Sequence, residues 1–164
     1  MMQAKEGKLT LLASLMVLIL ACCLGACNSN TPKDTSTIFT VNETGDKIRV
    51  GMDINAGYTI DTQMPFTVSK DGKAVVTGTF ITLDAYNSYV KSITSISDDH
   101  ITLLEENTKD GNPYIFYGFQ DGADKEFNYL LQVGDSKTGI LLGNKISEEE
   151  AKACFEALTF SVAK

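Results

Sequence analysis

An apolar run close to the start of the chain decides how much of the sequence is left to form a folded domain. Residues 9–20 are predominantly apolar, Lys5 and Lys8 precede them, and small residues lead from them to Cys27. A basic start, an apolar core and a stretch of small residues are the three parts of a secretory signal, which is removed from the mature protein. We therefore expect residues 1–26 to be a cleaved leader.

A membrane-spanning helix is the alternative interpretation of the same run. The stretch from residue 9 to residue 26 reaches the length of about 18 residues at which a span becomes possible. However, Thr10, Ser14 and Gly25 interrupt it, and no basic cluster follows it to stop transfer. Cleavage is therefore the interpretation that we favour.

The end of the leader resembles the lipobox of bacterial lipoproteins. Leu24, Gly25, Ala26 and Cys27 match the order of a leucine, two small residues and a cysteine, position by position. The resemblance implies that a diacylglycerol is attached to the Cys27 thiol and that the leader is cut just before it. Two acyl chains hold a protein stably to a membrane, so the expected location is the outer, extracytoplasmic face of the cell membrane. The alternative is an ordinary signal peptide that leaves Cys27 unmodified.

The cysteine count leaves no disulfide for the mature domain. Cys22 and Cys23 lie in the leader and Cys27 is assigned to lipid, so Cys154 is the one thiol that remains. The domain must then be held together by its core. Cys154 falls on an apolar helical stripe, where it is expected to act as a small hydrophobic residue. There is no CxxC motif, and His100 is the only histidine, so no zinc or redox motif is present.

A polar segment separates the leader from the remainder of the chain. Residues 28–37 are polar and lack apolar periodicity, so we expect the lipidated cysteine and a tether to occupy residues 27–37. Residues 38–164 then form one domain of ordinary size. The formal net charge of the chain is −7. This charge disfavours nucleic acid as a partner, because phosphate binding depends on basic side chains.

Two Asp-Gly pairs predict β-hairpins, because Asp-Gly readily adopts the positive φ angles of tight hairpin turns. The pairs are Asp71-Gly72 and Asp110-Gly111. The flanking segments are 66–69 and 74–81 for the first pair, and 101–106 and 114–119 for the second. Further short β segments are expected at 38–41, 47–52, 58–60, 127–133, 140–142 and 159–162.

The pairing in the first hairpin has two solutions. A two-residue loop places Val68 opposite Val75, whereas a three-residue loop with Gly72 bulged places Val68 opposite Val76. A shift of one residue moves every side chain to the other face of the sheet. We favour the second solution, because it puts Val76 and Phe80 on the same face as Val68.

Two segments have helical periodicity. In residues 82–97 an apolar stripe predicts an amphipathic helix that lies on a sheet, with Thr82 or Asp84 as its cap. The stripe consists of Leu83, Tyr86, Val90 and Ile93, with Tyr89 and Ile96 beside it. The second helix begins at Ser147, where Ser147 and Glu150 fit a capping box. Its buried stripe is expected to contain Ala151, Cys154, Phe155 and Leu158.

Strands, a helix, further hairpins and a final helix with a short strand predict an α+β domain, in which helices flank an antiparallel sheet. The order of these elements resembles the PsbP/Mog1 superfamily, and the ending from Ile146 through Ser147-Glu150 and Phe155 to Val162 carries most of the similarity. The resemblance covers roughly residues 47–163 and implies an α/β/α sandwich. It also implies a non-catalytic binding or accessory protein, since that is what most members are. It identifies no site residue.

The favoured functional hypothesis is a non-enzymatic lipoprotein that binds an envelope protein or a small molecule. Its expected partners are the membrane, through the anchor, and that ligand, and it needs no cofactor beyond the covalent diacylglycerol. The hypothesis predicts an exposed apolar or aromatic patch that uses Tyr58, Tyr114 or Tyr117.

A lipid-anchored hydrolase or metal-dependent enzyme is the alternative. It would use His100 with Asp98, Asp99 or Asp121, and it requires these side chains to meet in one cleft. No nucleophile elbow accompanies the histidine. A related metal candidate gathers Asp121, Asp124 and Glu126 as oxygen ligands for calcium, although the segment lacks the calcium-loop pattern. Acidic residues in turns are more often simply solvated.

Overall fold

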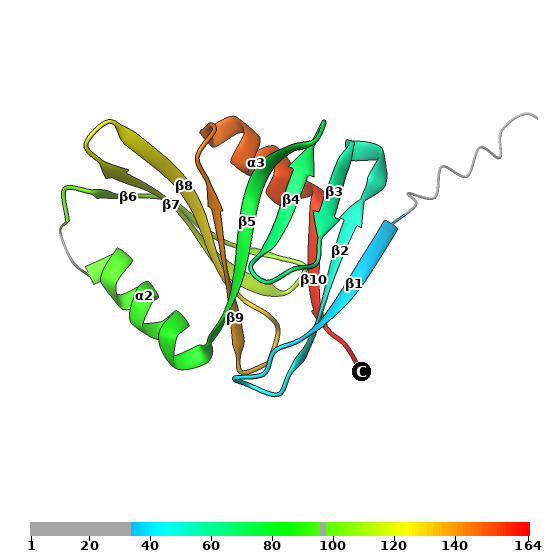
Figure 1. Cartoon of the computed structure of the whole chain (residues 1–164). Coiled ribbons are helices and arrows are strands. Elements are labelled where there is room, and N and C mark those ends of the chain that lie inside the picture. Colours follow the sequence, from blue (N-terminus) through cyan, green and yellow to red (C-terminus); the bar gives the residue numbers. More distant parts are fainter. Residues whose placement is uncertain (1–33, 96–97) are drawn as a thin grey trace, which may run out of the picture. The chain divides into compact units, whose positions relative to one another are not determined.

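The computed structural model describes residues 34–95 and 98–164. The expected leader, the lipobox, most of the predicted tether and Ile96 lie outside the described residues. Within the described part, every strand pairing is antiparallel, and the strands form one large and one small sheet with two α-helices (Figure 1). The fold is therefore of the α+β class with mainly antiparallel sheet, as the sequence predicts.

The large sheet has seven strands in the spatial order β3-β4-β5-β9-β8-β7-β6. The strands are β3 (Tyr58–Asp61), β4 (Phe66–Lys70), β5 (Lys73–Thr82), β6 (Ile101–Lys109), β7 (Asn112–Asp121), β8 (Asp124–Gln132) and β9 (Thr138–Asn144). Both predicted Asp-Gly hairpins are confirmed. The φ angles are 51° and 72° at Asp71 and Gly72, and 53° and 80° at Asp110 and Gly111, as a tight turn with two left-handed residues requires.

The first hairpin has the expected strand pairing but a different turn from the one predicted. Val68 pairs with Val76, which confirms the favoured register. However, Lys70 pairs with Lys73, so the loop has two residues, and the predicted three-residue loop is wrong. The register shifts within the ladder instead, where Val75 forms a β-bulge in β5. A bulge and a longer loop give the same offset, and apolar periodicity cannot distinguish them.

The small sheet joins the first and last strands of the described chain. Its order is β1 (Asp34–Thr40), β2 (Lys47–Asp53) and β10 (Leu158–Val162), with β2 in the middle. Because β1 begins at Asp34, the expected tether over 27–37 and the domain start at residue 38 are wrong. The first residues of β1 are polar and lie on an edge strand, so their composition resembles that of a linker.

The two helices pack on opposite faces of the large sheet. Helix α2 (Leu83–Ser95) buries Tyr86 and Ile93 on Ile115 and Leu130, which point to one face. Helix α3 (Glu148–Ala157) packs on the other face, together with the small sheet. Figure 1 shows α2 and α3 on either side of the strands. Alternate residues of a strand point to opposite faces, so β7 and β8 supply both cores. A short 3₁₀ helix (Ile54–Ala56) precedes β3.

The predicted helix starts are confirmed, with one change. Thr82 Oγ1 accepts a hydrogen bond from the Ala85 N–H at 3.3 Å, and Ser147 Oγ accepts from the Glu150 N–H at 3.1 Å. The reciprocal half of the capping box is different. The Ser147 N–H donates to Asn144 at 3.0 Å, whereas the Glu150 carboxylate accepts a hydrogen bond from Tyr58. In the described residues, neither helix is long and apolar enough to cross a bilayer.

Candidate functional site

A groove lies on the face of the large sheet that carries α2, at the part of the sheet beyond the α2 contacts. Its volume is about 470 Å³. The side chains that line it come mainly from β5, β8 and β9, namely Val75, Thr77, Thr79, Glu126, Asn128 and Leu141, and Lys145 and Ile146 follow β9. Helix α2 packs mainly over β8 and β9, and Thr77 and Thr79 of β5 stay exposed. The groove therefore has a mixed polar and apolar surface.

Asn128 is the most unusual residue of this groove. It pairs with Gly143 across the ladder, and Gly143 pairs with Thr77, so the three residues form one row. Asn128 is only 5% exposed. Even so, no hydrogen bond from within residues 34–95 and 98–164 reaches its side-chain amide. No buried side-chain nitrogen or oxygen atom of the described residues lacks a hydrogen-bond partner. The small exposed part of Asn128 therefore includes its amide, which water in the groove can reach.

The other buried asparagines show what a structural amide looks like in this protein. Asn112 donates to the Phe160 carbonyl at 2.9 Å and accepts from the Gly134 N–H at 2.8 Å. Asn144 donates to the carbonyl of the bulged Val75 at 2.8 Å, and it accepts two further hydrogen bonds where the chain enters α3. Both amides are fully used within the fold. Asn128 differs from them, and it faces the groove.

The rim of the groove carries one ion pair and one apolar side chain. Lys145 Nζ lies 2.8 Å from Glu126 Oε1, and this hydrogen bond raises the pKa of Lys145. Ile146 is 59% exposed. A second groove of about 510 Å³ shares Lys145 and Ile146 and runs toward the start of α3. The two grooves therefore adjoin at these two residues.

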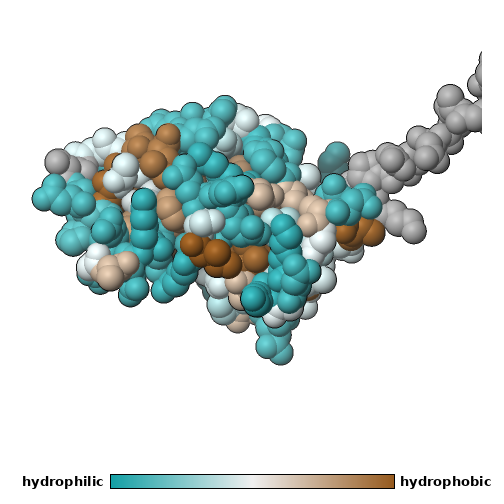
Figure 2. Space-filling model, turned by 90° about the horizontal axis from the view of Figure 1, so that it is seen from above, coloured by the Kyte–Doolittle hydropathy of each residue, from teal (hydrophilic) through white to brown (hydrophobic). Residues whose placement is uncertain are grey.

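The surface at this end of the molecule is mostly hydrophilic. Figure 2, which looks down on the upper end of the view in Figure 1, shows small apolar groups separated by polar side chains. The exposed large apolar residues of the described chain include Ile146, Met64 and Leu103, which lie on different elements. The face drawn in Figure 2 therefore carries scattered apolar side chains instead of one broad apolar patch.

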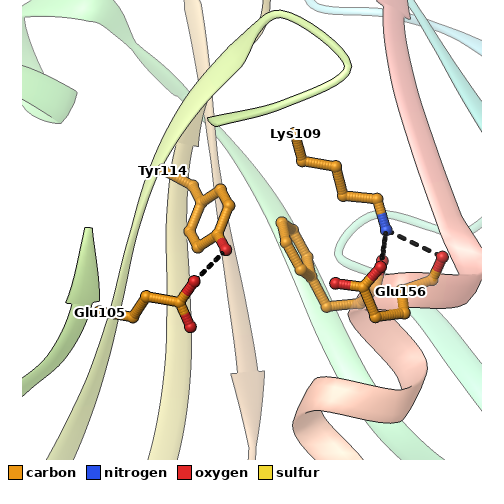
Figure 3. Close-up of polar contacts among 5 residues, drawn as sticks. Glu105, Lys109, Tyr114 and Glu156 are labelled. Atoms are coloured by element: carbon orange, nitrogen blue, oxygen red, sulfur yellow. Dashed lines mark hydrogen bonds and ion pairs between the residues drawn. The ribbon is translucent and has the colours of Figure 1, made fainter. Parts of the chain in front are cut away.

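The prediction of an exposed aromatic patch at Tyr58, Tyr114 or Tyr117 is wrong. These residues are 4%, 8% and 8% exposed, and each belongs to a buried apolar cluster. The Tyr114 hydroxyl donates to Glu105 at 2.7 Å (Figure 3). Burial, followed by this hydrogen bond, raises the pKa of Tyr114 to about 12. These tyrosines therefore stabilise the core and are not available to a ligand.

Lys109 also has a structural role. Its ammonium group donates to the carbonyls of Phe155 and Glu156 at 2.7 and 2.8 Å, and it lies 3.3 Å from the Glu156 carboxylate (Figure 3). These carbonyls belong to the last turn of α3, where a cation interacts favourably with the helix dipole. Lys109 thus fastens the end of α3 to β6.

The residues of the enzymatic alternative lie at one end of β6 and β7. His100 is exposed, and its Nδ1 lies 2.7 Å from the Gln120 carbonyl, so Nδ1 donates to that oxygen. The Asp98 carboxylate accepts a hydrogen bond from the His100 backbone at 2.9 Å. Asp99 and Asp121 are exposed as well. None of these four residues lines either groove.

The calcium candidate does not assemble into a cluster. Asp121 and Asp124 flank the two-residue turn between β7 and β8, whereas Glu126 is engaged by Lys145. In the described part of the chain, no three acidic, histidine or cysteine side chains are grouped so that they could hold a metal ion.

Cys154 lies in the core beside Phe155, as its helical stripe predicts. Its thiol is fully buried, and this burial raises its pKa to about 12. Nucleophilic or redox chemistry requires the thiolate. Cys154 therefore packs as a small hydrophobic residue.

Comparison with protein-family models, with curated proteins and with solved structures finds no match to this chain. The candidate site therefore depends on the geometry of the chain itself. Sequence analysis missed Asn128, because a polar residue between Phe127 and Tyr129 is expected to face water. Its position opposite a glycine of the neighbouring strand is the one signal that could have identified it.

Proposed function

We propose that the protein is a non-enzymatic binding lipoprotein, held to the outer face of the cell membrane by a diacylglycerol on Cys27. The lipobox resemblance at residues 24–27 supports the anchor. The first described strand begins at Asp34, seven residues after Cys27 in the sequence. Seven residues span at most about 25 Å, so an anchor on Cys27 would keep Asp34 close to the membrane surface.

The binding role is carried by one observation, the groove on the α2 face, to which the Asn128 amide is open. A groove of about 470 Å³ has the size of an ordinary small-molecule or peptide site. Most of its polar side chains lie on β5 and β8, and strands position a binding group more firmly than loops do. The partner is an envelope protein or a small molecule that reaches this groove.

We also propose a PsbP/Mog1-like α/β/α sandwich for the domain. The arrangement of α2 on one face of the large sheet and α3 on the other supports this assignment. The small sheet packs beside α3 on the same core, and this is the feature that any comparison with that superfamily must account for.

Metabolic labelling with a radioactive fatty acid tests the anchor. The wild-type protein is expected to carry label and to fractionate with membranes, whereas Cys27→Ser is expected to lose both. Label retained in Cys27→Ser would refute the assignment of the modified residue.

Capture of ligands by the wild-type chain and by Asn128→Leu tests the binding role. Loss of a specific ligand in the variant would support the groove. Turnover of an envelope substrate that disappears in His100→Gln would instead support the enzymatic alternative, and it would overturn the proposal of a non-enzymatic protein.

A further inference from the structure

We propose that the outer face of the small sheet docks on the membrane surface, where Lys47 and Arg49 bind the phosphate groups of anionic lipids. This inference rests on the anchor of the proposed function and adds the surface that meets the membrane. Along the chain, the small sheet is the element closest to the anchor, because its edge strand β1 begins seven residues after Cys27. Figure 1 shows β1, β2 and β10 side by side, away from α2.

One face of the small sheet is closed by the core, and the other face is open to solvent. Ile48, Val50 and Met52 of β2 are buried in the larger apolar cluster. Alternate residues of a strand point to opposite faces, so Lys47 and Arg49 point outward, and both are exposed. The outer face of the central strand therefore carries two positive charges.

Arg49 lies at the centre of this outer face. It pairs with Ile38 of β1 on one side and with Ser161 of β10 on the other. Ile38 is 48% exposed, so an apolar side chain lies beside the positive charge. The Arg49 guanidinium donates to the Ser36 hydroxyl at 3.1 Å. Because a guanidinium carries five N–H donors, this one hydrogen bond to a neutral oxygen leaves donors for a phosphate.

Among the described side chains, no carboxylate forms an ion pair with either basic group. The carboxylates of Asp46 and Asp53, at the two ends of β2, accept backbone N–H groups of other residues at 2.9 and 2.8 Å instead. Arg49 is also the one arginine of a chain whose formal net charge is −7. An acidic protein close to an anionic surface is expected to turn its basic face toward that surface.

The short connection to the anchor makes a weak contact sufficient. A basic side chain near an anionic lipid surface strengthens binding by about fivefold, so two such side chains give about 25-fold. A short flexible connection raises the effective concentration of a second contact to the millimolar range. The lipid on Cys27 therefore holds the domain at the surface, and Lys47 and Arg49 orient it.

Paramagnetic broadening of NMR signals in lipid nanodiscs tests the inference. The isotope-labelled full chain, purified from membranes, is placed in discs that contain phosphatidylglycerol and a lipid with a spin-labelled headgroup. We expect broadened backbone signals at Ile38, Arg49 and Ser161, and unchanged signals at the exposed Tyr89 of α2. The broadening should fall severalfold in phosphatidylcholine discs. It should also fall severalfold when NaCl is raised to about 1 M, where the screening length is about 3 Å.

The double variant Lys47→Gln/Arg49→Gln removes both charges at exposed positions, where a substitution has little effect on folding. The broadening at Ile38 and Ser161 should fall severalfold in this variant, because the attraction to the anionic lipid is lost. Lys91→Gln, which removes an exposed charge from α2, is the matched control and should leave the broadening unchanged.

Broadening spread evenly over the domain would overturn the inference, and so would small-sheet signals that respond neither to lipid charge nor to the double variant. If millimolar inorganic phosphate shifts the Arg49 signals as strongly as the anionic discs do, then the face binds free phosphate and docking is overturned as well. A chain that carries fatty-acid label but shows no broadening at the small sheet would overturn the docking face alone. Absence of label from the wild type would refute the anchor and the inference that rests on it.

Discussion

The two faces of the seven-stranded sheet are built on different principles. On the α3 face, the Phe155 ring stacks on Tyr129 at 3.8 Å between centroids and meets Tyr114 edge-on at 4.9 Å. The small sheet extends the same core. On the α2 face, a smaller cluster lies under the helix, and the adjoining groove is open to solvent.

Polar groups follow the same division. Lys109 and Asn144 secure the two ends of α3 with hydrogen bonds to backbone atoms, whereas Asn128 on the other face keeps its hydrogen-bonding capacity free of described partners. The comparison teaches that the α3 face is closed over the larger core, whereas the α2 face leaves part of the sheet open to solvent.

The largest expected effect is on the α3 core. Phe155→Ala should lower the free energy of unfolding by about 3–5 kcal/mol, because it opens a cavity among stacked rings. Ile93→Ala, on the buried side of α2, should lower the free energy of unfolding by about 2 kcal/mol. The effect is smaller because the smaller apolar cluster around Ile93 can relax into the space. Urea denaturation followed by circular dichroism measures both. Equal costs at the two sites would break the comparison.

The entry into α3 should be the next most sensitive point. Asn144→Ala removes the hydrogen bond to the bulged Val75 and two hydrogen bonds to the chain before α3. A loss of about 2–3 kcal/mol is expected, because the buried Val75 carbonyl and the two partly buried N–H groups lose their partner. Asn42→Ala, at an exposed position in the turn after β1, is the control and should change stability by less than about 0.5 kcal/mol. If Asn144→Ala left the free energy of unfolding unchanged, water would have replaced the hydrogen bonds of the amide.

A glycine pair tests how tightly the α3 face is packed. The Phe66 ring lies directly over Gly78 on the neighbouring strand, and a side chain on Gly78 would overlap it. Gly78→Ala should therefore cost about 1–3 kcal/mol through displacement of the ring. At Gly118 the nearest atoms would be 3.9 Å from a new methyl group, so Gly118→Ala should be close to neutral. Thermal unfolding compares the two variants, and similar Tm values would contradict this packing.

The last expected effect appears only at alkaline pH. The pKa of Cys154 is raised to about 12 by burial, from an ordinary value of 9.0. Above pH 9 the unfolded chain releases this proton while the folded chain keeps it, so stability falls with rising pH through the folded pKa. The slope for one group is at most about 1.4 kcal/mol per pH unit. Cys154→Ala should remove this part of the slope between pH 9 and 11, and an unchanged slope would show that the thiol is solvated.

Local patterns account for what could be predicted from the sequence. Both Asp-Gly hairpins, the stripe of α2 and the Ser147 start of α3 follow from turn chemistry and periodicity over a few residues. The pairing of β2 with β10 joins segments far apart in the chain, and no local pattern marks it. The prediction that Tyr114 and Tyr117 are exposed was wrong for a related reason. Strand β7 is buried on both faces from Tyr114 to Gly118, and alternation of apolar and polar residues cannot reveal a strand of that kind.

The candidate site was less predictable than the fold. Asn128 gains its significance from burial by neighbouring strands and from the glycine opposite it, and both depend on the completed sheet. The acidic residues and His100 stand out in the sequence, yet neither groove includes the histidine. Unusual composition therefore did not locate the grooves of this chain.

The position of β2 between β1 and β10 has a consequence for the order in which the two sheets fold. Ile48 of β2 pairs with Val162 of β10, more than a hundred residues further along the chain. Contacts between such distant segments form slowly, because a long loop must close first. We therefore expect the small sheet to assemble after the local hairpins of the large sheet.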